Sequence, residues 1–125
     1  MRGFSFNPIA MPHFIIDCSK EVLSNLTEKD VNTKVHQAAS SSGLFDESDI
    51  KVRMRPFENY MVGGSDQTPF IHVFAYIMEG RTTEQKANLS KSVVSELKSL
   101  FPEVPFIAMN IYDFEKATYA NLNTI

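Results

Sequence analysis

The stretch PFIHVFAYIM at residues 69–78 decides the fold, because it is an almost unbroken apolar and aromatic run that ends at Gly80. A run of this length and composition predicts a β-strand that is buried on both faces. A second run that opens with proline, PHFIIDC at residues 12–18, precedes it and predicts a similar strand. The chain therefore contains two comparable units, which start at Pro12 and Pro69.

A helix and another strand follow the first run. Thr27 is suited to cap a helix, and Gly43 is suited to end it. Between them, apolar residues recur at helical spacing, namely Val31, Val35 and Ala38. Residues 50–56 then alternate between apolar and cationic side chains, which predicts a strand with one cationic face.

The second run is followed by the same order of elements. Thr82 and Gln85 have the spacing of a capping box, and Pro102 marks the end of the helix that they open. The apolar stripe of this helix consists of Leu89, Val93, Leu97 and Leu100. Residues 106–112 predict a closing strand, so the chain reads strand, helix, strand twice over.

This order predicts an α+β fold of two tandem β-α-β units, at about 12–64 and 69–114, within a single domain over 12–125. Right-handed crossovers join such units into one four-stranded sheet that carries both helices on one face. The other face of so apolar a sheet needs cover, and we expect a closed ring of subunits to provide it. Residues 1–11 lack this pattern and are interpreted as an N-terminal extension, either a scar or an upstream start.

Composition narrows the class of function. The 125 residues carry a formal net charge of −3 and no basic run, which argues against a nucleic-acid partner. The single cysteine, Cys18, fits a buried core position, and the absence of a membrane-length span or signal core favours a cytoplasmic protein. His13 and His72 lack metal-site spacing, so we expect hydrogen bonding in the core or an interface and no metal.

The Met11-Pro12 pair raises the question of where the mature chain begins. If translation starts at Met11, or the chain is cut there, Pro12 carries a free secondary amine. An amide nitrogen is essentially non-basic, whereas an α-amine titrates near pH 8 and shifts with nearby charges and desolvation. The start point therefore decides whether the protein has a base at Pro12.

Three stretches carry a resemblance to a known family: PHFII from Pro12, GLF at residues 43–45, and the second run continuing through Gly80 and Arg81. They resemble the 5-carboxymethyl-2-hydroxymuconate delta-isomerases of the tautomerase superfamily. The sequence EGRTTEQK at residues 79–86 is also similar to the start of the helix in 4-oxalocrotonate tautomerase. The resemblance runs from Pro12 to about Phe114.

The resemblance implies acid/base catalysis by an amino-terminal proline, with no metal or organic cofactor. In the family, the secondary amine removes a proton from a dienol hydroxyl and returns one to a carbon further along the conjugated chain. The substrate is a small anionic unsaturated keto or enol acid in the breakdown of aromatic acids. The active sites lie between the subunits of a homotrimer.

Residue by residue, the resemblance places the catalytic proline at Pro12 and a family arginine at Arg81, a candidate carboxylate clamp. The alternative for Arg81 is a surface pair with Glu79 or Glu84. Lys51 stands where the family has another arginine, so it keeps the charge and loses the planar fork.

Two further residues are candidates for substrate binding. Arg53 shares the cationic face with Lys51 and Arg55, and that face is either a solvated strand edge or faces an anion. Tyr60, near the turn at Gly63 and Gly64, is either an aromatic wall residue or plain packing.

Two alternatives to the dicarboxylate isomerase follow from the same residues. One is a general tautomerase of arylpyruvate-like enols. The other is a non-catalytic trimeric binding protein, in which Pro12 stays internal and the extension completes the sheet of a neighbour as a strand or plug. We expect a chain that retains Met1 to have little or no isomerase activity.

Overall fold

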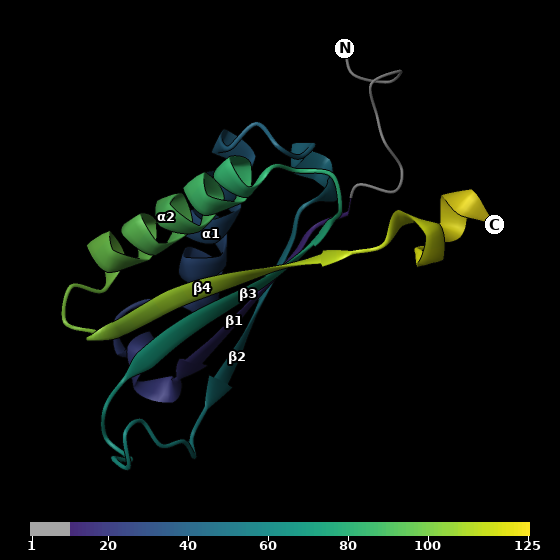
Figure 1. The fold of residues 1–125 in the computed structure, drawn as a ribbon. Helices are drawn as coiled ribbons and strands as arrows, with labels where there is room; N and C mark the ends of the chain where they lie inside the picture. Colours follow the sequence, from purple (N-terminus) through teal and green to yellow (C-terminus); the bar gives the residue numbers. More distant parts are fainter. Residues whose placement is uncertain (1–10) are drawn as a thin grey trace.

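The two runs that open with proline form the central strands of a four-stranded sheet. In the computed structural model, which describes residues 11–125, β1 (His13–Ser19) and β3 (Phe70–Met78) pair antiparallel. The edge strands are β2 (Lys51–Phe57) and β4 (Phe106–Phe114), and the sheet order is β2-β1-β3-β4 (Figure 1). The predicted α+β architecture is confirmed.

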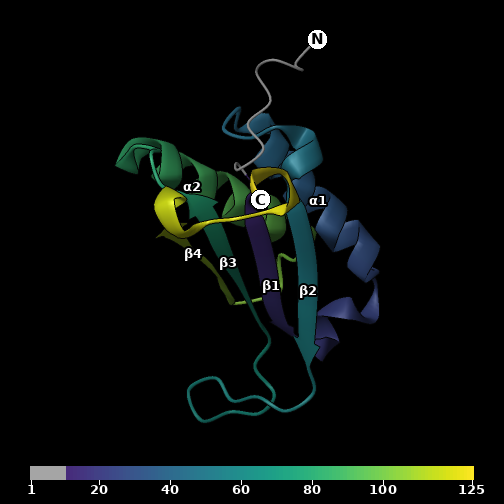
Figure 2. The ribbon, with the colours of Figure 1, turned by 90° about the vertical axis from the view of Figure 1, so that its right-hand side faces the viewer.

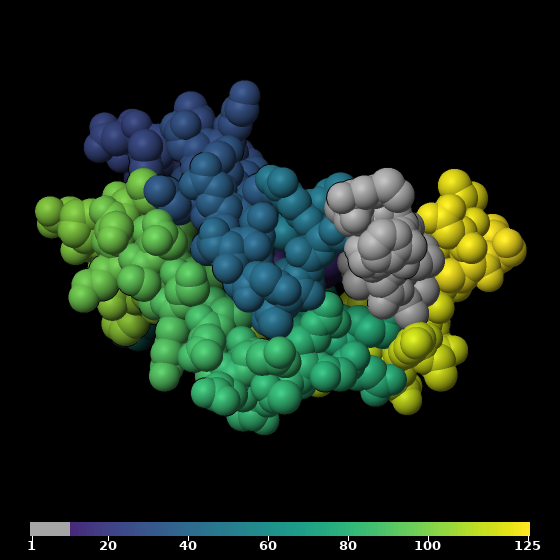
Figure 3. Space-filling model, turned by 90° about the horizontal axis from the view of Figure 1, so that it is seen from above, coloured from purple at the N-terminus to yellow at the C-terminus, as the bar shows by residue number. Residues whose placement is uncertain are grey.

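Each unit is a β-α-β crossover with parallel strands, as predicted. Within the first unit β1 pairs with β2, and within the second β3 pairs with β4. Helices α1 (Glu28–Ser41) and α2 (Thr83–Leu100) both cover one face of the sheet (Figures 1 and 2). Seen from above, the two helices lie side by side over the strands, and the C-terminal segment lies beyond them (Figure 3).

Both helices begin at the predicted caps. The Thr27 hydroxyl accepts from the Asp30 backbone N–H at 3.1 Å, and the Asp30 carboxylate accepts from the Thr27 N–H at 3.0 Å. Thr82 and Gln85 make the same reciprocal pair at 3.1 and 2.8 Å. Each of these capping boxes provides acceptors for two backbone N–H groups that have no partner within the first helical turn. At the other end of α1, Gly43 follows the cap residue with a φ of 75°, a conformation that favours glycine.

The core lies between the sheet and the helices. Alternate strand residues point to the helical layer because successive side chains of a strand face opposite sides. The fully buried strand residues include Phe14, Ile16, Cys18, Val73, Ala75 and Ile77. They meet the apolar stripes of the helices, which consist of Val31 and Val35 in α1 and Leu89, Val93 and Leu97 in α2. The prediction that Cys18 is a buried core residue is confirmed.

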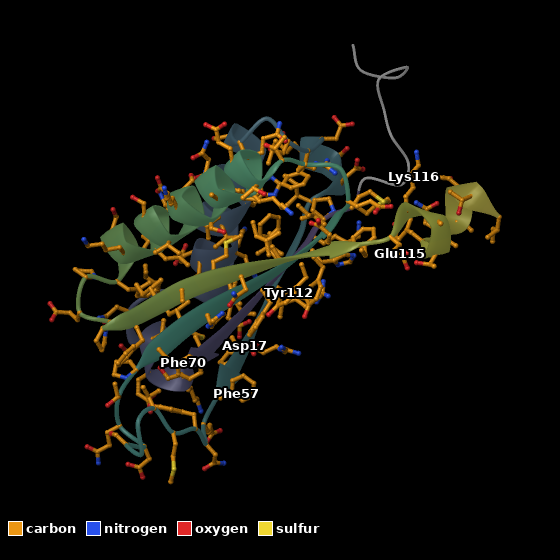
Figure 4. The ribbon with its side chains drawn as sticks, viewed as in Figure 1. Asp17, Phe57, Phe70, Tyr112, Glu115 and Lys116 are labelled. Carbon is orange, nitrogen blue, oxygen red and sulfur yellow. The ribbon has the colours of Figure 1, made fainter. Side chains whose placement is uncertain are left out.

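Among residues 11–125 of one subunit, no layer covers the opposite sheet face. The side chains of Asp17, Phe57, Phe70 and Tyr112 lie on this side, away from the helices (Figure 4). Aromatic rings stack along its β3 and β4 half: His72 on Phe74, and Tyr76 on Tyr112. Four of its large apolar side chains are exposed, namely Phe57, Tyr76, Phe106 and Tyr112. We call this surface the open face.

Element boundaries differ slightly from the prediction. Strand β4 continues two residues further than expected, to Phe114, because β3 offers it a parallel partner as far as Met78. Four short 3-10 turns were not predicted, since they have too few residues for a periodic pattern: η1 (Lys20–Ser24), η2 (Glu47–Asp49), η3 (Lys116–Thr118) and η4 (Leu122–Thr124).

The predicted extension lies, apart from Met11, outside the described residues. Among residues 11–125, no helix has both the length and the apolar character needed to cross a membrane.

Candidate active site

Pro12 lies at the head of β1, where its side chain is buried. Its carbonyl oxygen accepts a hydrogen bond of 3.1 Å from the backbone N–H of Lys51. This bond joins the residue before β1 to the first residue of β2, and the strand register then pairs His13 with Lys51. The fold therefore brings Pro12 and Lys51, distant in sequence, to the same end of the sheet.

The Lys51 side chain is exposed on the open face. Its ammonium Nζ lies 3.1 Å from the Sδ atom of Met11. A thioether is a weak acceptor, so this contact competes poorly with an anion. In a chain that begins at Pro12 this contact is absent, which leaves the ammonium available to a carboxylate.

Arg81 lies at the same end of the sheet as Pro12. Strand β3 runs antiparallel to β1, and Tyr76 is the partner of His13. The last residue of β3, Met78, is therefore at the level of the residues that precede His13. Arg81 follows after Gly80, between the end of β3 and the start of α2.

The guanidinium of Arg81 is held by the loop that follows α1. Its Nη2 donates to the carbonyl oxygen of Leu44 at 2.7 Å, and its Nη1 donates to that of Met78 at 3.3 Å. The guanidinium carbon lies 5.1 Å from the ring centroid of Phe45. Among the described residues, neither Glu79 nor Glu84 pairs with Arg81.

Burial lowers the pKa of Arg81, and the nearby Asp113 carboxylate opposes that shift. An arginine nevertheless stays protonated in proteins, so Arg81 is a fixed, half-buried positive charge. The GLF motif at residues 43–45 now has a physical role: it supplies both an acceptor and an aromatic surface to this cation.

The cationic face of β2 divides into two parts. The Arg55 guanidinium donates two hydrogen bonds to the Asp17 carboxylate, at 2.7 and 3.1 Å, and these bonds raise the pKa of Arg55. Arg53 instead has Nη1 at 3.1 Å from Nδ1 of His13. Within residues 11–125, neither Arg53 nor Lys51 has a carboxylate partner. Arg55 thus has a structural partner, whereas Lys51 and Arg53 are free to meet an anion.

Tyr60 lies at the far end of the sheet. It follows the end of β2, and because β1 and β2 are parallel this end is remote from Pro12. Its hydroxyl donates to Oε1 of Glu21 at 2.6 Å, and its ring packs on Phe70 with centroids 5.6 Å apart. One subunit does not bring Tyr60 to Pro12, so its proposed role in binding requires a neighbouring subunit.

An apolar crevice of about 540 Å³ also lies at the far end. Its described lining includes Val22, Leu26 and Phe101, with Glu21 and Glu103 as its charged residues. A crevice whose charges are acidic suits an anionic acid poorly. Metal ligation finds no support among residues 11–125 either, where no group of three or more His, Cys, Asp or Glu residues is placed to hold an ion.

Sequence reasoning missed the contact between His13 and Arg53 and the role of Leu44 and Phe45. The contact between His13 and Arg53 could be inferred only once the β1–β2 register was known. The GLF motif signalled that Leu44 and Phe45 matter, but their contact with Arg81 depended on how the loop folds.

Several solved structures share this fold. A 5-carboxymethyl-2-hydroxymuconate isomerase from Deinococcus radiodurans R1 superimposes with a TM-score of 0.77 at 18% identity, covering 90% of each chain. A 5-carboxymethyl-2-hydroxymuconate delta-isomerase gives 0.71 at 15%, covering 90% of this chain and 88% of the other. A fused 4-OT, described as a symmetric trimer, gives 0.76 at 12%, covering 90% and 95%. At these identities the likeness establishes the fold, which is that of the tautomerase superfamily.

The particular family follows from the sequence. The family model of 5-carboxymethyl-2-hydroxymuconate isomerase matches residues 12–125, and the chain belongs to that family. It is therefore an isomerase of the tautomerase superfamily. The curated proteins contain no match to this sequence.

Proposed function

We propose that this protein is a cofactor-independent keto–enol isomerase of a small unsaturated dicarboxylate or tricarboxylate, with Pro12 as the amino-terminal base. The substrate is 5-carboxymethyl-2-hydroxymuconate or a similar product of aromatic-acid breakdown. The observation that carries the proposal is the position of Pro12, which heads β1 beside Lys51 and at the Arg81 end of the sheet. The family match also begins at this residue.

The proton transfer needs a base whose pKa lies near the working pH. A free prolyl amine titrates near pH 8, and the neighbouring positive charges lower its pKa towards neutrality. The neutral amine takes the proton of the 2-hydroxyl, the oxygen becomes a carbonyl, and the conjugated double bonds shift by one position. The same nitrogen then returns the proton to the carbon at the far end of that shift.

Two cations have distinct roles in this scheme. Arg81, whose geometry is fixed by Leu44 and Phe45, binds a carboxylate or stabilises charge that develops on the 2-oxygen. Lys51 offers a more mobile ammonium on the other side of Pro12. Since lysine lacks the planar fork of arginine, its hold on a carboxylate is less directional.

The proposed assembly is a homotrimer in which the open faces of the subunits are covered. The support is the exposed aromatic half of that face and a matched fold described as a trimer. A contiguous apolar surface of this kind marks a protein interface. In such a trimer, a neighbouring subunit is the source of any Tyr60 side chain that lies near Pro12.

The test compares three chains in a ketonisation assay with 2-hydroxymuconate: the chain that begins at Pro12, the same chain with Pro12→Ala, and the full chain with Met1 confirmed by mass spectrometry. We expect turnover from the first chain only. Turnover by the full chain would contradict the base assignment, because an amide nitrogen has no available lone pair.

The remaining results select the alternatives. Equal activity on arylpyruvate enols and on dicarboxylate dienols identifies a general tautomerase. No turnover by any of the three chains, together with a stable trimer, identifies a binding protein.

A further inference from the structure

Arg53 is a charged side chain whose contacts differ from those of its neighbours on the same strand. It lies two residues from Lys51 and two from Arg55, and all three point to the open face. Arg55 is neutralised by Asp17, but the described partner of Arg53 is the neutral ring atom Nδ1 of His13. Two adjacent like charges without a carboxylate repel each other, so Lys51 and Arg53 together favour a bound anion.

The chemistry of the contact fixes the state of His13. An arginine has donors and no acceptor, so Nδ1 of His13 must be unprotonated to accept from it. Burial lowers the pKa of His13, and the charges of Arg53 and Lys51 lower it further. At neutral pH the imidazole is therefore an acceptor that fixes the direction of the Arg53 guanidinium.

The spacing of the two cations sets the kind of anion. Residues at alternate positions of a strand lie on one face about 6–7 Å apart. The carboxylates at the two ends of a short extended diacid are separated by a comparable distance. Lys51 is the cation nearer Pro12, since its own backbone is bonded to the Pro12 carbonyl, and Arg53 lies one step further along β2.

We propose that His13 positions Arg53 as the binding group for the distal carboxylate of the substrate, and that this pair gives the enzyme its preference for dicarboxylates over monocarboxylates. The inference rests on the proposed function, which places the reacting end of the substrate at Pro12. Arg53 is a specificity residue because it contacts the substrate, and His13 is a positioning residue because it acts through Arg53.

A dependence on pH follows from the same contacts. The charged and titratable groups that face His13 are Lys51 and Arg53 from β2 and Tyr76 from β3. With no ligand, the cations keep the imidazole neutral. Protonation of Nδ1 removes the acceptor that positions Arg53, so the preference for a diacid should weaken as pH falls through the lowered pKa of His13.

The experiment measures binding without turnover. Adipate and hexanoate, which match in chain length and differ by one carboxylate, are titrated calorimetrically into the full chain and into the chain that begins at Pro12. We expect adipate to bind about tenfold more tightly than hexanoate, the effect of one charge-assisted hydrogen bond. Arg53→Gln should abolish this preference and leave the affinity for hexanoate unchanged.

Three variants separate positioning from general electrostatics. Arg55→Gln removes the same charge from the same face of β2, and we expect it to preserve the preference. His13→Asn retains an acceptor but does not titrate, so the preference should persist at pH 7.5 and show no loss between pH 7.5 and 5.5. His13→Phe, which lacks the acceptor, should reduce the preference already at pH 7.5.

The proposal is overturned if both chains bind the two acids equally, or if Arg53→Gln and Arg55→Gln reduce adipate binding to the same extent. An unchanged pH profile in His13→Asn removes His13 from the scheme. Loss of ketonisation with the adipate preference intact refutes the proposed function alone, whereas turnover without the preference refutes this inference alone.

Discussion

At the residue scale, the half-buried Arg81 is stabilised by carbonyl oxygens and an aromatic ring. The Leu44 carbonyl accepts from its Nη2, and the ring of Phe45 lies beneath its guanidinium. Carbonyl acceptors leave the full positive charge of the side chain in place, whereas a carboxylate neutralises it. The same contacts that hold the loop therefore preserve a cation for the substrate.

Arg81→Met tests how much this residue contributes to the fold itself. We expect the free energy of unfolding to fall by about 1.5–3 kcal/mol, because the Leu44 carbonyl loses a charged donor. Urea denaturation of the variant measures this change. Lys98→Met, at an exposed position of α2, is the control and should change stability by less than about 0.5 kcal/mol. Equal stability of the two variants would show that the Arg81 contacts contribute little to folding.

Cys18 gives a second prediction at this scale. Burial raises the pKa of its thiol to about 11, with smaller contributions from Glu28 and Asp17. At pH 8 only about one thiol in a thousand is then a thiolate, the reactive form. The folded protein should react with a thiol reagent at least a hundredfold more slowly than the protein in urea. As the sequence has one cysteine, the rate reports on this site alone. A fast reaction in native buffer would mean that β1 opens readily.

At the element scale, the start of α2 is defined by a reciprocal pair of hydrogen bonds between Thr82 and Gln85. Thr82→Ala removes the acceptor for one backbone N–H and should lower the free energy of unfolding by about 1 kcal/mol. The neighbouring exposed residue provides the matched control, since Thr83→Ala keeps the box intact. Thermal unfolding of both variants measures the difference. A similar loss in the two would show that threonine content, and not the cap, matters at this position.

Most elements were predictable from the sequence because their signals are local. The caps at Thr27 and Thr82, the stop at Gly43 and the alternation along β2 each depend on a few neighbouring residues. The ends of strands were less accessible. Strand β4 extends to Phe114 because β3 lies beside it, which is a property of the pairing and not of the β4 sequence.

The site was predictable to a smaller extent, for the same reason. A motif match placed Pro12 and Arg81, and the fold brings both to one end of the sheet. Which cation of β2 has a carboxylate depends on the register that sets Asp17 opposite Arg55. That register cannot be derived from residues 50–56 alone.

At the scale of the whole molecule, the open face is divided along the sheet. The β1 and β2 half carries Arg53, Arg55 and Asp17, whereas the β3 and β4 half carries stacked aromatic rings. In the part of one subunit that the structure describes, only the helical face of the sheet packs against a core. The aromatic half therefore favours contact with another copy, and the charged half near Pro12 favours contact with an anion.

Phe74→Glu tests this division at the centre of the open face. Phe74 lies on β3 between Ile15 and Asn110 and stacks on His72 at 4.5 Å. Because its side chain faces away from the core, a glutamate there should leave the subunit folded. In a trimer that covers this face, the same glutamate buries a charge without a partner, at a cost of several kcal/mol per site. We therefore expect sedimentation velocity to show a trimer for the unmodified chain and a folded monomer for the variant. Ala87→Glu, exposed on α2, adds the same charge and should leave the trimer intact. A monomer in the unmodified chain would contradict the proposed trimer, and a trimer that survives Phe74→Glu would place the subunit interface elsewhere.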